Sequence, residues 1–237
     1  MKKTTYIFLL TTITTLFSCS KNDDQTEIET QDFRKSNQEI LDSKSFNKKG
    51  IQHNRDLEYL LNHLPEDTDT TNIRKYTQQI LSEKYQRDHL GDMHIFNSYN
   101  DPNEMLNELF ERKMINTQLF LLAKIDFKDL NDFEQYDNSI DNFVISRLNK
   151  IPELSTIDKE KYINFLSVLK HSFKFWDANS NNSLGRNKSF KIDSFIKELI
   201  ALAQADSVTN LVSIGGIDLP YTTFDYVQSS YFRFNNF

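Results

Sequence analysis

The sequence predicts an all-α fold, an irregular bundle of about six helices that follows a disordered tether. Three observations lead to this prediction. The 237 residues include only five Gly and four Pro, too few for a turn-rich sandwich or barrel. Apolar residues recur at helical spacing from Gly50 onward. The 19 Phe and 10 Tyr residues supply enough aromatic side chains to bury a sizeable core.

Two helices are predicted in the first part of the bundle. Leucines at i, i+3, i+4 and i+7 predict the first helix, and Pro65 ends it. Gly50 fits a tight turn ahead of this helix, and Asn54 is placed to cap it. A second helix follows the cap-like Thr70-Thr71-Asn72. The leucines are Leu57, Leu60, Leu61 and Leu64, and the second apolar face consists of Ile73, Tyr76, Ile80 and Leu81.

The clearest helix start in the chain is Asp101-Pro102-Asn103-Glu104. An Asp can cap a helix, Pro suits the first helical position, and Glu104 can reach back to the cap. The following run from Met105 to Ala123 is apolar on one side. Within it, residues 119–123 are apolar all round, which predicts a central position for them.

Three more apolar stretches complete the predicted bundle. A stripe from Phe127 to Val144 continues until Pro152, a helix is predicted from Ile157 to Trp176, and another from Ile192 to Ala205. The third of these is followed by Gly215-Gly216, which breaks the chain. The tail from Tyr221 to Phe237 is ambiguous between helix and extended structure. The aromatic stripe ending at Trp176, with Tyr162, Phe165, Leu166, Leu169 and Phe173, is interpreted as core rather than as a sugar-binding platform.

The charge and the cysteine content exclude several classes of protein. The formal net charge is −6, and an acidic protein repels nucleic acid and anionic lipid. Cys19 is the only cysteine, which excludes an internal disulfide and any Cys-based zinc cluster. The sequence predicts no cofactor.

The N-terminus predicts export from the cytoplasm. Lys2 and Lys3 precede an apolar run from Tyr6 to Phe17. Twelve helical residues rise only about 18 Å, which is too short for a bilayer core of about 30 Å. We therefore predict a signal peptide over residues 1–18, a flexible tether over 19–49 with a short helix around Phe33 to Leu41, and a helical domain over 50–237.

Leu16-Phe17-Ser18-Cys19 resembles a bacterial lipobox. This resemblance implies that a diacylglycerol is attached to the Cys19 thiol, that the chain is cut before Cys19, and that the new amino group is acylated. The alternative is a secreted protein with an incidental cysteine near its cleavage site. Ser20-Lys21-Asn22-Asp23-Asp24 is similar to the export signal of Bacteroidota surface lipoproteins, with Asn22 shifting the acids by one place. The expected location is the outer face of the outer membrane, with its periplasmic face as the alternative.

Two groups of residues are candidate metal sites. Asp177 to Lys188 resembles an EF-hand calcium loop with Asp177, Asn179, Asn181 and Ser183 as ligands, but Lys188 stands where the bidentate Glu belongs. The competing interpretation is an interhelical loop. His89, Asp92 and His94 could bind zinc, with His63 or His171 joining through the fold, but they lack the i, i+4 spacing of a metalloprotease helix.

The stretch from Gly50 to Asn54, GIQHN, resembles the start of the folded part of small Bacteroidota lipoproteins of unknown function, as does SFKFW at 172–176. We consider His53 and Asn54 a candidate ligand site, with a packed histidine at a capped helix entry as the alternative. The predicted function is a lipid-anchored envelope protein whose helical domain binds an envelope or extracellular partner. The alternatives are a surface hydrolase with a His and carboxylate metal site, and a weak calcium-binding module.

Overall fold

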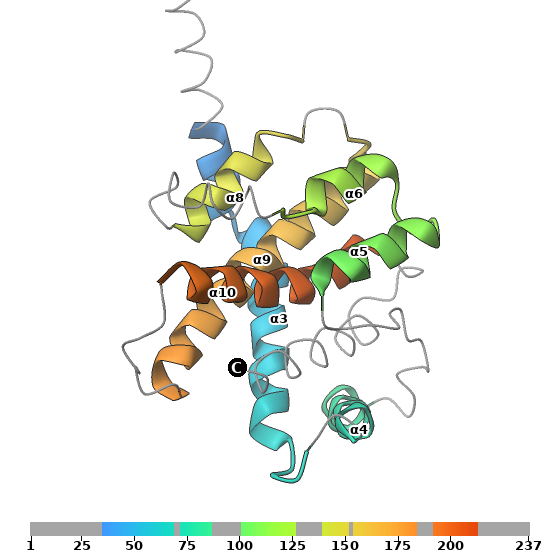
Figure 1. Cartoon of the computed structure of the whole chain (residues 1–237), viewed down its shortest axis with the longest axis vertical. Helices are drawn as coiled ribbons and strands as arrows, with labels where there is room; N and C mark the ends of the chain where they lie inside the picture. Colours follow the sequence, from blue (N-terminus) through green and yellow to red (C-terminus); the bar gives the residue numbers. More distant parts are fainter. Residues whose placement is uncertain are drawn as a thin grey trace, which may run out of the picture.

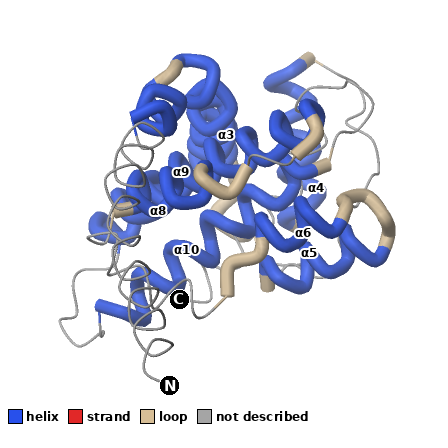
Figure 2. Tube along the Cα trace, turned by 90° about the horizontal axis from the view of Figure 1, so that it is seen from above, coloured by secondary structure: helices blue, strands red, loops and turns tan. Residues whose placement is uncertain are grey.

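The computed structural model describes residues 35–68, 72–86, 101–126, 139–151, 154–183 and 192–212, and within these ranges the chain is helical and contains no strand. Figure 2 shows this composition, with helices in blue joined by short tan loops. The all-α bundle is therefore confirmed. Residues 35–42 are helical, and the following elements are α3 (Lys44–His63), α4 (Ile73–Tyr85), α5 (Pro102–Glu111), α6 (Thr117–Ala123), α8 (Ile140–Leu148), α9 (Thr156–Ser183), α10 (Ile192–Val208) and the 3₁₀ helix η2 (Thr209–Leu211).

Helix α9 is the central element of the bundle. Helices α3 and α10 both pack against it, and Figure 1 shows the three helices crossing one another near the middle of the molecule. The predicted aromatic face of α9 is buried in this crossing, and Trp176 is only 1% exposed, which confirms its interpretation as core. The buried face consists of Tyr162, Phe165, Leu166, Leu169, Phe173 and Trp176.

Helix α6 is short, and its last carbonyl groups are satisfied by side chains from three other helices. Arg147 of α8 donates to Leu122 O at 3.2 Å and to Lys124 O at 3.1 Å. The Tyr162 hydroxyl of α9 donates to Leu122 O at 3.0 Å, and Gln204 Nε2 of α10 donates to Ala123 O at 3.2 Å. Because the final carbonyls of a helix have no partner within it, these bonds allow α6 to end inside the bundle.

Several predicted helix ends are confirmed. Helix α3 ends at His63, one residue before the cap Leu64 and two before Pro65. Helix α5 begins at Pro102, and the carboxylate of Asp101 accepts from Asn103 N at 2.8 Å. The cap supplies a partner for one of the N–H groups that the first turn leaves unpaired.

The boundary between tether and domain is corrected. The prediction places residues 19–49 in a flexible tether with a short helix around Phe33 to Leu41. Residues 35–42 are helical, in agreement with that short helix, but α3 begins at Lys44, ahead of the predicted start of the domain, and Ser43 Oγ accepts from Phe46 N at 3.1 Å. Leu41 is 1% exposed and Phe46 is 2% exposed. The polar composition of this segment conceals two core residues, so the bundle starts at least fifteen residues earlier than predicted.

The apolar run from Met105 to Ala123 is not continuous. It is divided into α5 and α6 by a turn in which Lys113 has a left-handed φ of 57°, and the Asn116 side chain caps α6 by accepting from Leu119 N at 2.9 Å. Leu119 is buried, but Leu121 is 62% exposed, so the prediction that this run is central on all sides is wrong. Its apolar composition does not reveal that one face of α6 lies on the surface.

The later helices differ from their predicted bounds. The predicted stripe from Phe127 begins as helix α8 only at Ile140, where the Ser139 hydroxyl accepts from Asn142 N at 3.4 Å; residues 127–138 lie outside the described ranges. Helix α9 continues to Ser183, beyond the predicted end at Trp176. The signal peptide, Cys19, Gly215-Gly216 and the C-terminal tail also lie outside the described residues.

Candidate functional site

Gly50 lies at the closest approach of α3 to α9. It is an interior residue of α3, so the predicted tight turn is wrong. Its N–H lies 3.0 Å from Ser167 Oγ of α9, within hydrogen-bond distance. A Cβ atom at this position would lie 2.5 Å from Ser167 O and 2.7 Å from His171 Cγ, and closer still to His171 Cδ2. Glycine is therefore required because α9 occupies the space that a side chain would fill.

His53 and Asn54, the predicted ligand residues, both lie in this crossing. Asn54 is in the middle of α3 and does not cap it; its Nδ2 donates to His171 O at 2.9 Å. His53 is 2% exposed, and its Nε2 lies 3.5 Å from Asp206 Oδ2 of α10. The structure therefore brings the two residues to the interface of α3 with α9 and α10, where they pair with protein groups.

Asp206 is the centre of a buried polar cluster that joins three helices. Its Oδ2 accepts a hydrogen bond from the Ser172 hydroxyl and another from Trp176 Nε1 at 3.0 Å. Asp206 and Ser172 are both 0% exposed. In a catalytic triad the imidazole lies between the serine and the carboxylate. Here the carboxylate lies between Ser172 and His53, so the imidazole is not placed to take the serine proton.

The sequence contains a signal for this cluster that lies outside the motifs described above. Asp206 is the only acidic or basic residue after Glu198 in the apolar second half of α10. Because a buried carboxylate is tolerated only when it is hydrogen-bonded or paired, a single Asp in such a segment indicates a polar partner in the core. Ser172 and Trp176 are spaced i, i+4 on α9, so one helical face presents both donors.

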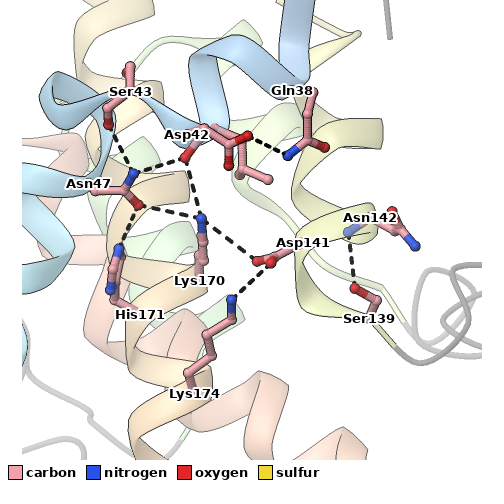
Figure 3. A network of polar contacts seen from close by, with 11 residues as sticks. Gln38, Asp42, Ser43, Asn47, Ser139, Asp141, Asn142, Lys170, His171 and Lys174 are labelled. Carbon is pink, nitrogen blue, oxygen red and sulfur yellow. Dashed lines mark hydrogen bonds and ion pairs between the residues drawn. The ribbon is translucent and has the colours of Figure 1, made fainter. Parts of the chain in front are cut away.

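A second polar cluster lies around Asn47, as Figure 3 shows. Asn47 Nδ2 donates to Leu41 O and to Ser43 O, both at 2.9 Å. The Oδ1 of the same amide is therefore the acceptor for His171 Nε2 at 2.8 Å and for Lys170 Nζ at 3.4 Å. Lys170 also donates to Leu41 O at 3.3 Å. These contacts join the turn over residues 41–43 to α9.

The electrostatics of this cluster lower the pKa of both basic groups. Burial lowers the pKa of Lys170, against the opposing effect of the Asp141 carboxylate. Burial also lowers the pKa of His171 to about 4, and the charges of Lys170 and Lys174 act in the same direction. Asp141 lies 2.9 Å from Lys174 Nζ and 3.8 Å from Lys170 Nζ. His171 is therefore neutral in the folded protein at neutral pH.

A third cluster joins α3 to α4. The Asp56 carboxylate is 0% exposed and lies 2.6 Å from both Lys84 Nζ and the Tyr85 hydroxyl. Burial raises the pKa of Tyr85, and the hydrogen bond and charge of Asp56 raise it further. A buried carboxylate with a close cation and a phenol donor is a structural ion pair, and it satisfies the charge inside the bundle.

A surface depression lies at the corner formed by the α5–α6 turn and the start of α9. Its volume is about 640 Å³. Phe110 stacks on Phe120 with ring centroids 4.8 Å apart, and Asn116 Nδ2 donates to Asp158 Oδ2 at 2.9 Å across the two segments. The depression is lined by Phe110, Glu111, Lys113, Met114, Ile115, Asn116, Thr117, Asp158 and Lys161.

The predicted calcium loop is partly described. Helix α9 includes residues 177–183, so this part is helical, whereas an EF-hand loop wraps its backbone around the ion. Asn179 Nδ2 donates to Phe175 O at 2.8 Å within the helix. Lys188, His89, Asp92 and His94 lie outside the described residues. The described ranges contain no group of three His, Cys, Asp or Glu residues that could hold a metal ion.

No protein-family model, curated protein or solved structure matches this chain significantly. Among the described residues, no helix is both long and apolar enough to cross a membrane.

Proposed function

We propose that this chain is a lipoprotein of the bacterial cell envelope, attached to the outer membrane through acyl chains on Cys19, and that its helical domain binds a partner. The observation that carries the proposal is the order of the N-terminal residues. Two lysines, an apolar run and Leu16-Phe17-Ser18 precede the only cysteine in the chain. Two or more acyl chains on one residue hold a protein stably at a membrane.

The distance between Cys19 and the bundle supports action close to the membrane surface. Residues 20–34 separate Cys19 from the first described helix. At a maximum of about 3.5 Å per residue, this segment spans at most about 50 Å. The bundle would therefore remain near the membrane, where envelope proteins and extracellular molecules are the available partners.

The surface at the α5–α6 corner supports a binding role for the bundle. Phe110 is 38% exposed and lines the depression, and Leu121, which is 62% exposed, lies one helical turn after the lining residue Thr117 on α6. Exposed large apolar side chains beside a depression are typical of interaction sites. The lysines and acids around the rim would orient a partner rather than supply most of the affinity.

Acylation is tested by metabolic labelling with an alkyne analogue of palmitate in a bacterial host. The wild-type protein is expected to carry the label and to fractionate with the outer membrane. Cys19→Ser should lose the label and retain the uncleaved signal peptide, because serine lacks the thiol that accepts the lipid. Ser20→Ala is the matched control and should behave as wild type. A Cys19→Ser protein that keeps its label and its processing would overturn the proposal.

Binding at the α5–α6 corner is tested by photo-crosslinking in the same cells. A photoreactive amino acid at Leu121 should give discrete crosslinked products. The same amino acid at Glu58, an exposed residue of α3, is the control. Equal products at both positions, or none at Leu121, would contradict a binding role for this corner. Digestion of intact cells with a protease distinguishes the outer face of the membrane from the periplasmic face.

A further inference from the structure

The turn between the helix over residues 35–42 and α3 is joined to α9 by the Asn47 amide and by Lys170, which donates directly to Leu41 O at 3.3 Å. Asn47 uses both protons of its Nδ2 on the turn, at Leu41 O and Ser43 O. Its Oδ1 accepts from Lys170 and His171 on the opposite side. Figure 3 shows Asn47 between the turn and the two basic residues of α9. Both basic residues that share the Oδ1 acceptor therefore contribute to the attachment of this segment, beside the burial of Leu41 and Phe46.

The shared acceptor places two basic nitrogens close together. Lys170 Nζ is 3.4 Å and His171 Nε2 is 2.8 Å from the same oxygen, so the two nitrogens are at most about 6 Å apart. Because Asn47 Oδ1 is an acceptor, His171 Nε2 carries the proton of the neutral imidazole, and a second proton would add at Nδ1. That proton would create a second cation beside Lys170, which is 7% exposed.

The other charged groups around His171 do not compensate for this added charge. On α9, Lys174 is a further cation. On α8, the Asp141 carboxylate favours a charged His171, but it already pairs with Lys174 at 2.9 Å. On α3, His53 acts in the same direction as the lysines. On the helix over 35–42, the charge of Asp42 raises the pKa of Lys170 and so favours its charged form. The balance of these groups disfavours a charged His171 in the packed state.

The imidazole is also confined sterically. Gly50 of α3 approaches it so closely that even a methyl group would not fit between them. The ring therefore cannot turn toward α3 to separate its charge from Lys170 unless α3 moves away. Both cations belong to α9, so movement of the start of α3 away from α9 relieves their repulsion by letting water screen the charges and by letting the His171 ring turn away.

We propose that Asn47, Lys170 and His171 form an acid-sensitive latch, which releases the helix over residues 35–42 and the start of α3 from α9 when His171 takes up a proton. The pKa of His171 in the latched and released states decides the direction of this pH dependence. In the latched state His171 is neutral, and its pKa is about 4, whereas a solvated histidine has a pKa of about 6.5. Protons therefore bind the released state preferentially, and release increases as the pH falls from 6.5 toward 4.

The latch has a consequence for the lipid anchor, and this consequence alone rests on the proposed function. Residues 35–50 connect the bundle to the segment that follows Cys19. Release of these residues would lengthen the connection between the membrane and the bundle. In acid, the binding surface of the bundle would then reach further from the membrane.

The latch is tested by hydrogen–deuterium exchange of the full-length protein at about pH 7.5 and about pH 5, corrected for intrinsic exchange rates. We expect opening of the segment over residues 35–50 to increase about tenfold at the lower pH, after allowance for solvent screening at a half-buried site. Residues 102–123 of α5 and α6 should change much less. His171→Gln retains a donor for Asn47 but does not titrate, so its segment 35–50 should lose most of this pH dependence.

Two results would overturn the latch. One is an equal rise in exchange at low pH for the wild-type and His171→Gln proteins. The other is a rise spread evenly over residues 102–123 and 35–50. A second measurement uses the wild-type protein alone: an NMR titration of the His171 ring should show protonation below pH 5, and a normal titration near pH 6.5 would refute the inference. The failure of acylation at Cys19 would leave both measurements unaffected.

Discussion

Replacing Gly50 by alanine tests the helix crossing at the centre of the bundle. The new Cβ atom would lie 2.5 Å from Ser167 O and 2.7 Å from His171 Cγ, both well inside van der Waals contact. The imidazole can shift slightly, but Ser167 O belongs to the backbone of α9. Helices α3 and α9 must therefore move apart, and this movement weakens the packing contacts around the crossing.

The expected magnitude is the difference between two opposing effects. Overpacking a well-packed core costs about 3 kcal/mol at the upper end of its usual range, which applies here because a backbone atom is involved. Alanine in a helix interior regains about 1 kcal/mol relative to glycine. The Gly50→Ala protein should therefore lose about 2 kcal/mol of its free energy of unfolding. For a chain of this size, its Tm should fall by about 4–8 °C.

The assay is urea unfolding followed by far-UV circular dichroism. Lys48→Ala, an exposed substitution two residues earlier in α3, is the matched control and should change the free energy of unfolding by less than about 0.5 kcal/mol. In a His171→Ala background the cost of Gly50→Ala should be smaller, because the clash with the imidazole ring is absent. It should not disappear, because the clash with Ser167 O remains. A Gly50→Ala protein as stable as wild type would refute the close crossing.

Three further substitutions test the polar groups of the bundle. Asp206→Leu should lower the free energy of unfolding by more than about 2 kcal/mol, because it leaves Ser172 and Trp176 without their buried acceptor. The fluorescence of Trp176, the only tryptophan, should also shift in the native state of this variant. Lys84→Met should cost about 3 kcal/mol in urea unfolding, since Asp56 would remain buried without its cation; a loss below 1 kcal/mol would show that Tyr85 suffices. Asp101→Ala should lower the free energy of unfolding by about 1 kcal/mol, because it removes the cap of α5, whereas the control Glu111→Ala at an exposed site of the same helix should change it very little. Equal losses for the two substitutions would show that the cap does not stabilise α5.

Local signals predicted the helices well where a short stretch decides the outcome. Pro65 and the Asp101-Pro102 pair act on the turn that contains them, and both predicted helix ends are confirmed. The aromatic face of α9 is also confirmed, because helical spacing alone places its residues on one side. The division at Lys113 could not be predicted in this way, since the run is apolar on both sides of the turn.

Burial and pairing between distant segments were harder to predict. Leu41 and Phe46 stand in a polar stretch, and only the packing of α3 and the preceding helix against α9 makes them core residues. Gly50 was predicted to form a turn, whereas a neighbour more than a hundred residues away in the sequence requires the glycine. Such requirements depend on which atoms the fold brings together, and a local pattern contains no record of them.

By itself, the sequence determines the helical class and several helix ends, because each depends on residues that are near one another in the chain, and it is also the basis of our proposal that lipid is attached at Cys19. The tertiary structure alone decides that His53, Ser172, Trp176 and Asp206 form one buried cluster, and that Asn47 joins a turn to Lys170 and His171. The physical reason is that hydrogen bonds and steric contacts act over a few ångströms in space, whatever the separation along the chain.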